Sequence, residues 1–197
     1  KGREDLTSQS SLLFESWDCA NSPSLPALFA QPFEGGYRIW VHSPTVSERL
    51  NLGGKLDKFL RDKGEVICLG NNWIDFLSES IKSAAEFKIN EDRESISLMI
   101  DINSKGVVTD WKFSLSIIRP IHIITPTHLK TINKRKATSK SIPIALKSVK
   151  DSLEVLYTII NSSKLINQCN DGCIKLDQHI PNLERLCELQ KAFPSRD

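Results

Sequence analysis

The stretch "ESISLMIDINSKGVVTDWKFSLSII", residues 94–118, indicates the fold more clearly than any other part of the chain. Apolar side chains alternate with other types in both of its halves: Ile96, Leu98, Ile100 and Ile102 in the first, and Trp111, Phe113, Leu115 and Ile117 in the second. Such alternation has the period of a strand with one buried face. "NSKG", residues 103–106, supplies a turn between the two halves. The stretch therefore predicts an antiparallel hairpin that buries this apolar face.

Further strands and helices are indicated on both sides of the hairpin. "GGYRIWVH", residues 35–42, alternates in the same way after a glycine pair, which is typical of a strand entered through a tight turn. "GGKLDKFLRDKG", residues 53–64, places apolar side chains on one helical face and ends at a glycine. Nearer the C-terminus, apolar residues recur at spacings of three and four: Leu146, Val149, Leu153, Leu156 and Ile160. This spacing predicts an amphipathic helix over residues 144–166.

These elements together predict an α+β fold, with a mixed or antiparallel sheet and packed helices. We divide the chain into a strand-rich part, residues 1–129, a basic loop, residues 130–143, and a helical part, residues 144–197. Within the helical part, "NLERLCELQKAF", residues 182–193, predicts a last short helix.

The middle of the chain is strongly basic. From Lys112 to Lys150 there is no acidic residue, but there are nine lysines or arginines. The densest part, "KTINKRKATSK", residues 130–140, is either an ordinary solvated loop or a strip that contacts phosphate groups. The absence of acids favours the second interpretation, and its candidate residues are Lys130, Lys134, Arg135, Lys136 and Lys140. No aromatic residue is interleaved with them, so base stacking is not expected there.

Length and composition are those of one globular domain. The chain has 197 residues, of which 40% are apolar and 25% charged. No apolar run approaches the roughly 20 residues of a membrane span, so no membrane partner is expected. Five cysteines, an odd number, suit free thiols in a reducing compartment, and we expect a cytoplasmic protein. The chain begins at Lys1 without a methionine, so we expect it to be a segment of a longer protein. Four residues near the C-terminus match no common zinc spacing: Cys169, Cys173, His179 and Cys187.

Five segments in order resemble the ribonuclease II / ribonuclease R family, whose catalytic module is the RNB domain. They are "REDLTS" (3–8), "GGYRIWVHSPTVSERL" (35–50), "GGKLDKFLRDKGEVICL" (53–69), "NEDRESISLMIDINSKGVVTDWKFSLSIIRP" (90–120) and "LEVLYTIINSSKLINQCNDGCIKLD" (153–177). The resemblance implies an α+β module that threads single-stranded RNA, 3′ end first, and hydrolyses it one nucleotide at a time with magnesium. It covers only the first part of such a module, so residues 1–197 are expected to form a partial RNB-like domain.

The family's metal site should follow the opening "REDLTS" motif as an Asp and then an Asp-x-Asp-Asp cluster. Two magnesium ions at such a site need several carboxylate oxygens. When this chain is laid on that pattern, the four positions fall at Glu15, Asn21, Pro23 and Ser24. No register restores the cluster, because no acid lies between Asp18 and Glu34. We therefore expect no intact catalytic residue and no bound metal cofactor in this chain, and we interpret the stretch as a plain loop.

A second family feature is also altered. The family places a tyrosine near the 3′ end of the RNA, where it stacks on a base, and here "GEVICLG", residues 64–70, has Cys68 at that position. A thiol offers no stacking platform, and stacking of this kind contributes roughly 1–3 kcal/mol per base. Both the metal ligands and the substrate clamp are thus expected to be missing.

These observations leave three hypotheses. The first is a catalytically degenerate module that no longer cuts and instead binds RNA or a protein partner. The second is an active magnesium-dependent 3′–5′ exoribonuclease whose carboxylates come from outside this segment or from a partner subunit. The third is a protein-interaction scaffold that does not bind RNA. The parent sequence on both sides of this segment would discriminate among them, through the presence or absence of an acidic cluster and of RNA-binding barrels.

Overall fold

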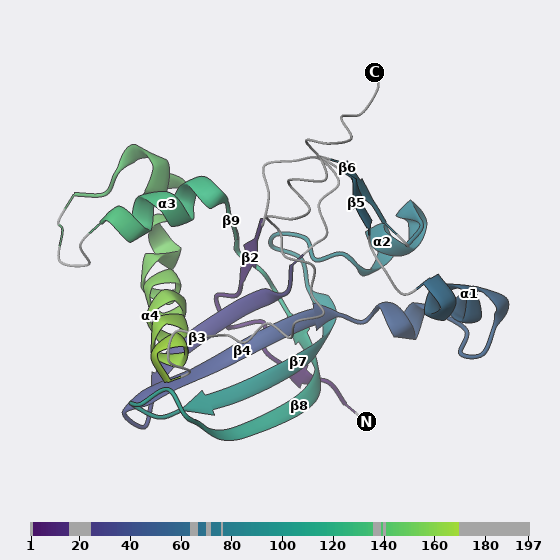
Figure 1. Ribbon diagram of the computed structural model, residues 1–197, viewed down its shortest axis with the longest axis horizontal. Helices are drawn as coiled ribbons and strands as arrows, with labels where there is room; N and C mark the ends of the chain where they lie inside the picture. Colours follow the sequence, from purple (N-terminus) through teal and green to yellow (C-terminus); the bar gives the residue numbers. More distant parts are fainter. Residues whose placement is uncertain are drawn as a thin grey trace.

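A computed structural model describes residues 2–15, 25–63, 67–69, 72–75, 77–135, 139 and 141–169, without the side chains of residues 68, 69, 72 and 73. Its centre is a mixed sheet of seven strands in the order β1-β8-β7-β4-β3-β2-β9 (Figure 1). The strands are β1 (Glu4–Asp5), β2 (Leu12–Phe14), β3 (Ala27–Phe33), β4 (Gly36–Pro44), β7 (Arg93–Ile102), β8 (Val108–Ile118) and β9 (His122–Ile124). Four central pairings are antiparallel, whereas β1 and β9 join the edges in parallel. The predicted α+β class with a mixed sheet is confirmed.

The remaining elements lie in two groups at opposite ends of the sheet (Figure 1). Between β4 and β7 the chain forms η1 (Val46–Arg49), α1 (Lys55–Lys63), the small β5–β6 sheet (Ile67–Leu69 and Asn72–Ile74) and α2 (Glu79–Ala85). After β9 it forms α3 (Pro126–Lys134), η2 (Ile144–Ser152) and α4 (Leu153–Cys169). No described helix is long and apolar enough to cross a membrane. The helix predicted over residues 182–193 lies outside the described residues.

The principal core lies between η2–α4 and the sheet face formed by β3 and β4. The predicted apolar stripe is confirmed, because Leu146, Val149, Leu153 and Leu156 are all buried in this core. The segment is not one uniform helix, however. It starts as a 3₁₀ helix, leaves helical geometry at Val149 (φ −117°, ψ 20°) and continues as an α-helix from Leu153. η2 contacts α3 and β9, whereas α4 contacts β3 and β4, so the stripe joins two neighbouring parts of one core.

The hairpin forms as predicted, but the prediction that its apolar face is buried is wrong for the β8 half. β7 and β8 pair in register, with Leu98 opposite Phe113 and Ile100 opposite Trp111. α4 packs on β3 and β4 and does not extend over β8. Trp111 is therefore 61% exposed and Phe113 60% exposed. The alternation identified the apolar face correctly, but it carries no information about which neighbour covers that face.

Part of the opposite face of the hairpin is buried and rich in serine. Ser95, Ser97 and Ser116 are fully buried there, and the Ser95 and Ser116 hydroxyls lie 2.6 Å apart. Nδ1 of His42 on β4 lies 2.7 Å from the Ser97 hydroxyl, and the His42 ring stacks against Trp40. Burial lowers the pKa of His42 from 6.5 to about 4. The imidazole is therefore neutral in the folded chain at neutral pH.

The stability of the fold is expected to depend on pH through His42. As the pH falls below 6.5, the unfolded chain takes up a proton at this residue while the folded chain resists until about pH 4. Stability present at pH 7 is thus lost between pH 6.5 and 4, and a shift of this size corresponds to about 3 kcal/mol. Urea unfolding at several pH values would measure the loss. The His42→Gln variant, which lacks this titration, should show a shallower decline, and parallel curves for both proteins would contradict the assignment.

Candidate nucleic-acid interface

Of the four positions aligned with the family's metal ligands, the structure describes only Glu15. It follows β2 directly, and its backbone N–H donates to the Ile124 carbonyl at 3.0 Å, which extends the parallel pairing of β2 with β9. The side chain is exposed. Asn21, Pro23 and Ser24 lie outside the described residues. Their arrangement around Glu15 stays a prediction.

Among the residues that the structure describes, the surroundings of Glu15 are apolar. A cavity of about 310 Å³ lies beside it, and its other described lining residues are Phe14, Leu25, Pro26, Leu28, Pro126 and Leu129. Magnesium prefers oxygen ligands in octahedral geometry, and the described part of this lining supplies one carboxylate. In the part of the chain that the structure describes, no group of three or more His, Cys, Asp or Glu side chains is placed to hold a metal ion. The described residues therefore do not fit the magnesium site that the family implies.

Cys68 lies in β5, where its backbone pairs with Trp73 of β6. The structure does not describe the Cys68 side chain, so the expected loss of a stacking platform remains a prediction. Of the four Cys and His residues near the C-terminus, Cys169 ends α4 as an exposed free thiol. The other three lie beyond the described residues.

The prediction that residues 130–140 form a loop is wrong for their first half, because Lys130 and Lys134 lie on the helix α3. Thr125 caps this helix: its hydroxyl accepts from the His128 N–H at 3.3 Å, while its own N–H donates to His128 Nδ1 at 3.1 Å. Proline follows at the first helical position, where its fixed φ favours a helix. Buried Ile132 anchors the helix to the core. The sequence "TPTH" carries this start signal, which the run of basic residues obscured.

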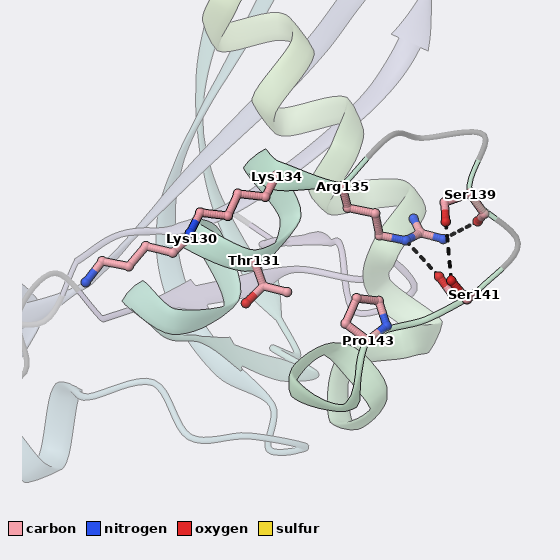
Figure 2. A pocket seen from close by; sticks show the side chains of 7 residues that line it. All are labelled: Lys130, Thr131, Lys134, Arg135, Ser139, Ser141 and Pro143. Atoms are coloured by element: carbon pink, nitrogen blue, oxygen red, sulfur yellow. Dashed lines mark hydrogen bonds between the residues drawn. The ribbon is translucent and has the colours of Figure 1, made fainter.

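Three basic residues line a cavity of about 550 Å³ between α3 and the segment that leads to η2; Figure 2 shows Arg135 directed toward that segment and the two lysines directed away from it. Its lining residues are Lys130, Thr131, Lys134, Arg135, Ser139, Ser141 and Pro143. No carboxylate lines it among the residues that the structure describes. Lys136 and Lys140 fall outside the described residues, so their place relative to this cavity stays a prediction.

Arg135 has a structural role at this cavity. Its guanidinium donates to the Ser139 carbonyl at 2.5 Å, to the Ser141 carbonyl at 3.2 Å and to the Tyr157 hydroxyl at 2.7 Å. These bonds, two of which Figure 2 shows as dashed lines to the serines, tie the loop after α3 to α4. Arg135 thus shapes the cavity, and its donors are largely committed to the protein itself.

Lys130 and Lys134 remain available to bind an anion. They are one turn apart, so they lie on the same side of α3. Neither forms an ion pair with a described residue. Figure 2 shows both side chains extending to the same side of α3, away from Ser139 and Ser141, and two ammonium groups placed in this way can donate hydrogen bonds to phosphate oxygens. The sequence singled out both lysines as candidate RNA contacts, and that role stays a prediction; it did not indicate the contacts of Arg135.

Comparisons with known proteins agree with this architecture. The chain matches the RNB domain family over residues 3–191. It is 24% identical over 93 residues to "Ribonuclease II, chloroplastic/mitochondrial" of Arabidopsis thaliana, which is 47% of this chain and 12% of that protein. It is 23% identical over 94 residues to "Protein sts5" of Schizosaccharomyces pombe, which is 48% of this chain and 9% of that protein. The chain thus belongs to the RNB-domain family and spans a small part of these relatives.

Solved structures show the same fold. Mycoplasma genitalium RNase R in complex with ribose-methylated single-stranded RNA superposes with a TM-score of 0.68 at 18% identity, over 84% of this chain and 25% of that one. Yeast Ssd1, described as a pseudonuclease, superposes with a TM-score of 0.59 at 15% identity, over 70% of this chain and 17% of that one. At these identities the likeness supports the fold alone.

Proposed function

We propose that this chain is an RNB-family module that holds single-stranded RNA through its phosphates and does not cut it. The observation that carries the proposal is the scarcity of acids in the stretch that we align with the family's metal ligands. From residue 16 to residue 33 the only acid is Asp18. The one aligned acid that the structure describes, Glu15, lies against an apolar cavity. One or two carboxylates cannot balance the four positive charges of two magnesium ions.

RNA binding is supported by the basic cavity and by a structural relative. Lys130 and Lys134 present two cations on one side of α3, and lysine contacts to phosphates give affinity through counterion release. Mycoplasma genitalium RNase R, which shares the fold, was solved in complex with single-stranded RNA. Lys136 and Lys140 would extend the strip along the same loop. Such contacts bind many sequences alike, since they read the backbone and not the bases.

Two further observations fit a module that does not cut. Cys68 stands where the family's stacking tyrosine is expected, so the 3′ end of an RNA would not be clamped. Yeast Ssd1, which has the same fold, is described as a pseudonuclease. The second and third hypotheses make different predictions: an exoribonuclease would shorten RNA from its 3′ end, and a scaffold would show no salt-dependent RNA binding.

The phosphate contacts are tested by the salt dependence of binding. The Lys130→Ala/Lys134→Ala double variant should lower the slope of log affinity against log salt by about 1.4, because each lost contact to a single strand removes about 0.7. Fluorescence anisotropy of a labelled oligouridine, titrated at several salt concentrations, measures the slope.

Lys88→Ala/Lys105→Ala is the matched control, since both residues are exposed lysines away from the cavity. Its slope should stay close to that of the unmodified chain. Equal slopes for all three proteins would show that Lys130 and Lys134 do not contact phosphates. Absence of any RNA binding would favour the scaffold hypothesis.

A further inference from the structure

The outer edge of β8 lacks a neighbouring strand over most of its length. β1 pairs with β8 only at Glu4 opposite Ser116 and Asp5 opposite Ile117. The stretch from Val108 to Leu115 therefore has no strand on that side among the described residues. In Figure 1, β8 runs along the margin of the sheet. An uncovered edge of this length is a template for pairing with another strand.

The backbone groups that face outward can be identified. The Leu6 N–H donates to the Ile117 carbonyl, so Ile117 directs its backbone groups toward the outer side. Because the direction alternates along a strand, Trp111, Phe113 and Leu115 direct theirs the same way. The Trp111 N–H donates to a carboxylate oxygen of the preceding residue, Asp110, at 2.8 Å. The Asp110 carboxylate thus satisfies the Trp111 N–H in a single copy, and it can release this N–H when another strand pairs with the edge.

The side chains along this edge are aromatic and exposed. Trp111 and Phe113 lie edge to face, with ring centroids 5.8 Å apart. Leu115 on the same strand is 44% exposed, and Ile96 lies next to it on β7 at 36%. Single exposed apolar residues are ordinary, but a contiguous patch beside an open edge marks a docking surface. The other face of the strand carries the charged side chains of Asp110 and Lys112.

We propose that β8 pairs antiparallel with β8 of a second copy of this chain, with Trp111 opposite Trp111 at the twofold axis. The hydrogen-bonding direction is compatible with twofold centres at Trp111, Lys112 and Phe113, the three residues in the middle of the open stretch, and we compare these three registers. The register centred on Lys112 places two lysines opposite each other, which is unfavourable. The register centred on Phe113 brings Asp110 of the second copy opposite Ser116, where β1 already pairs.

The register centred on Trp111 has neither difficulty. It lies farthest from β1, and it places Asp110 of each copy opposite Lys112 of the other. In a single copy the Lys112 ammonium lies 3.8 Å from a carboxylate oxygen of Glu4, an exposed pair that the dimer exchanges for Asp110 of the other copy. Twofold symmetry therefore creates two cross-strand pairs of opposite charge. Each Trp111 N–H exchanges its Asp110 partner for the carbonyl of the other copy, and the freed carboxylate meets a lysine. Charge complementarity thus selects a second copy as the occupant and also its register.

Charge reversal tests this arrangement in the full 197-residue chain. Sedimentation equilibrium over a range of concentrations should show a monomer–dimer equilibrium for the unmodified chain. Lys112→Asp replaces two attractive contacts by two repulsive ones and should weaken the dimer about tenfold. Asp110→Lys/Lys112→Asp restores the opposite charges in exchanged positions and should recover most of that loss.

Both substitutions lie at exposed positions, and thermal unfolding at a concentration where the chain is monomeric checks that the variants fold. A chain that stays monomeric throughout would overturn the proposal and show that the edge receives something other than a second copy. A dimer that Lys112→Asp leaves unchanged, or that the double reversal does not rescue, would overturn it as well. The result is independent of RNA binding, because Lys130 and Lys134 are not altered.

Discussion

Leu156→Asp is expected to abolish folding of the chain, whereas Ile144→Asp is expected to leave it folded. Leu156 lies on α4 with none of its side chain exposed, packed in the core between the helices and the β3–β4 face. Ile144, twelve residues earlier at the start of η2, is 84% exposed. The two substitutions introduce the same carboxylate into the same helical region, so the comparison isolates the effect of burial.

The expected size of the effect follows from the cost of burying a charge. An unpaired carboxylate in an apolar site costs several kcal/mol, and the lost leucine contacts add about 2–5 kcal/mol more. The free energy of unfolding of a single domain is about 5–15 kcal/mol. The combined cost of the substitution is therefore comparable with the whole stability of the fold. Circular dichroism and urea unfolding would show the loss of structure. A Leu156→Asp variant as stable as Ile144→Asp would show that the stripe on α4 is not part of the core.

The sequence predicted those elements whose side chains repeat with a clear period. The alternation in β7 and β8 located the hairpin, and the spacing from Leu146 to Leu156 located the helical stripe. Periodicity reports which side chains share a face, but whether that face is covered depends on tertiary packing. α4 rests on β3 and β4, so the apolar face of β8 is exposed although its pattern equals that of β7.

The candidate site was predictable in composition but not in shape. The run without acids identified Lys130 and Lys134, yet it suggested a loop where α3 forms, because charge density hid the Thr125–Pro126 helix start. The cavity itself depends on Arg135, which bonds to two carbonyls of the following loop and to the Tyr157 hydroxyl. No local pattern in the sequence links residue 135 with residue 157, since their contact arises only when the loop folds back on α4.

The other large expected effect concerns metal binding and RNA cleavage. We expect the unmodified chain to bind Mn²⁺ weakly and to leave a labelled single-stranded RNA intact when Mg²⁺ or Mn²⁺ is present. Metal binding is measured from the electron paramagnetic resonance signal of free Mn²⁺, and RNA integrity by gel electrophoresis. The reason is electrostatic, because Glu15 and Asp18 are the only acids in the aligned stretch. Unit charges about 4 Å apart attract by roughly 4 kcal/mol at an effective dielectric of 20, so losing three carboxylates is severe.

Restoring the acids tests whether missing negative charge, and not loop geometry, limits metal binding. The Asn21→Asp/Pro23→Asp/Ser24→Asp variant should bind Mn²⁺ at least about tenfold more tightly, a modest share of the Coulomb energy after desolvation is subtracted. Pro23→Asn/Ser24→Asn is the matched control, since with the native Asn21 it places neutral amides at the same three positions. That control should bind the ion as weakly as the unmodified chain. A gain shared by both variants would mean that loop geometry, and not charge, limits metal binding.

Tighter metal binding need not bring cleavage, and this distinction decides between the hypotheses. With Cys68 in place of the expected stacking residue, the 3′ end has no aromatic partner to hold it against the ions. The acid-restored variant should therefore still leave RNA intact while binding Mn²⁺. Release of mononucleotides from the 3′ end by the unmodified chain, abolished by Glu15→Gln, would contradict the proposed function directly. In that case Glu15 would act with carboxylates from a second copy or another segment, and the exoribonuclease hypothesis would replace ours.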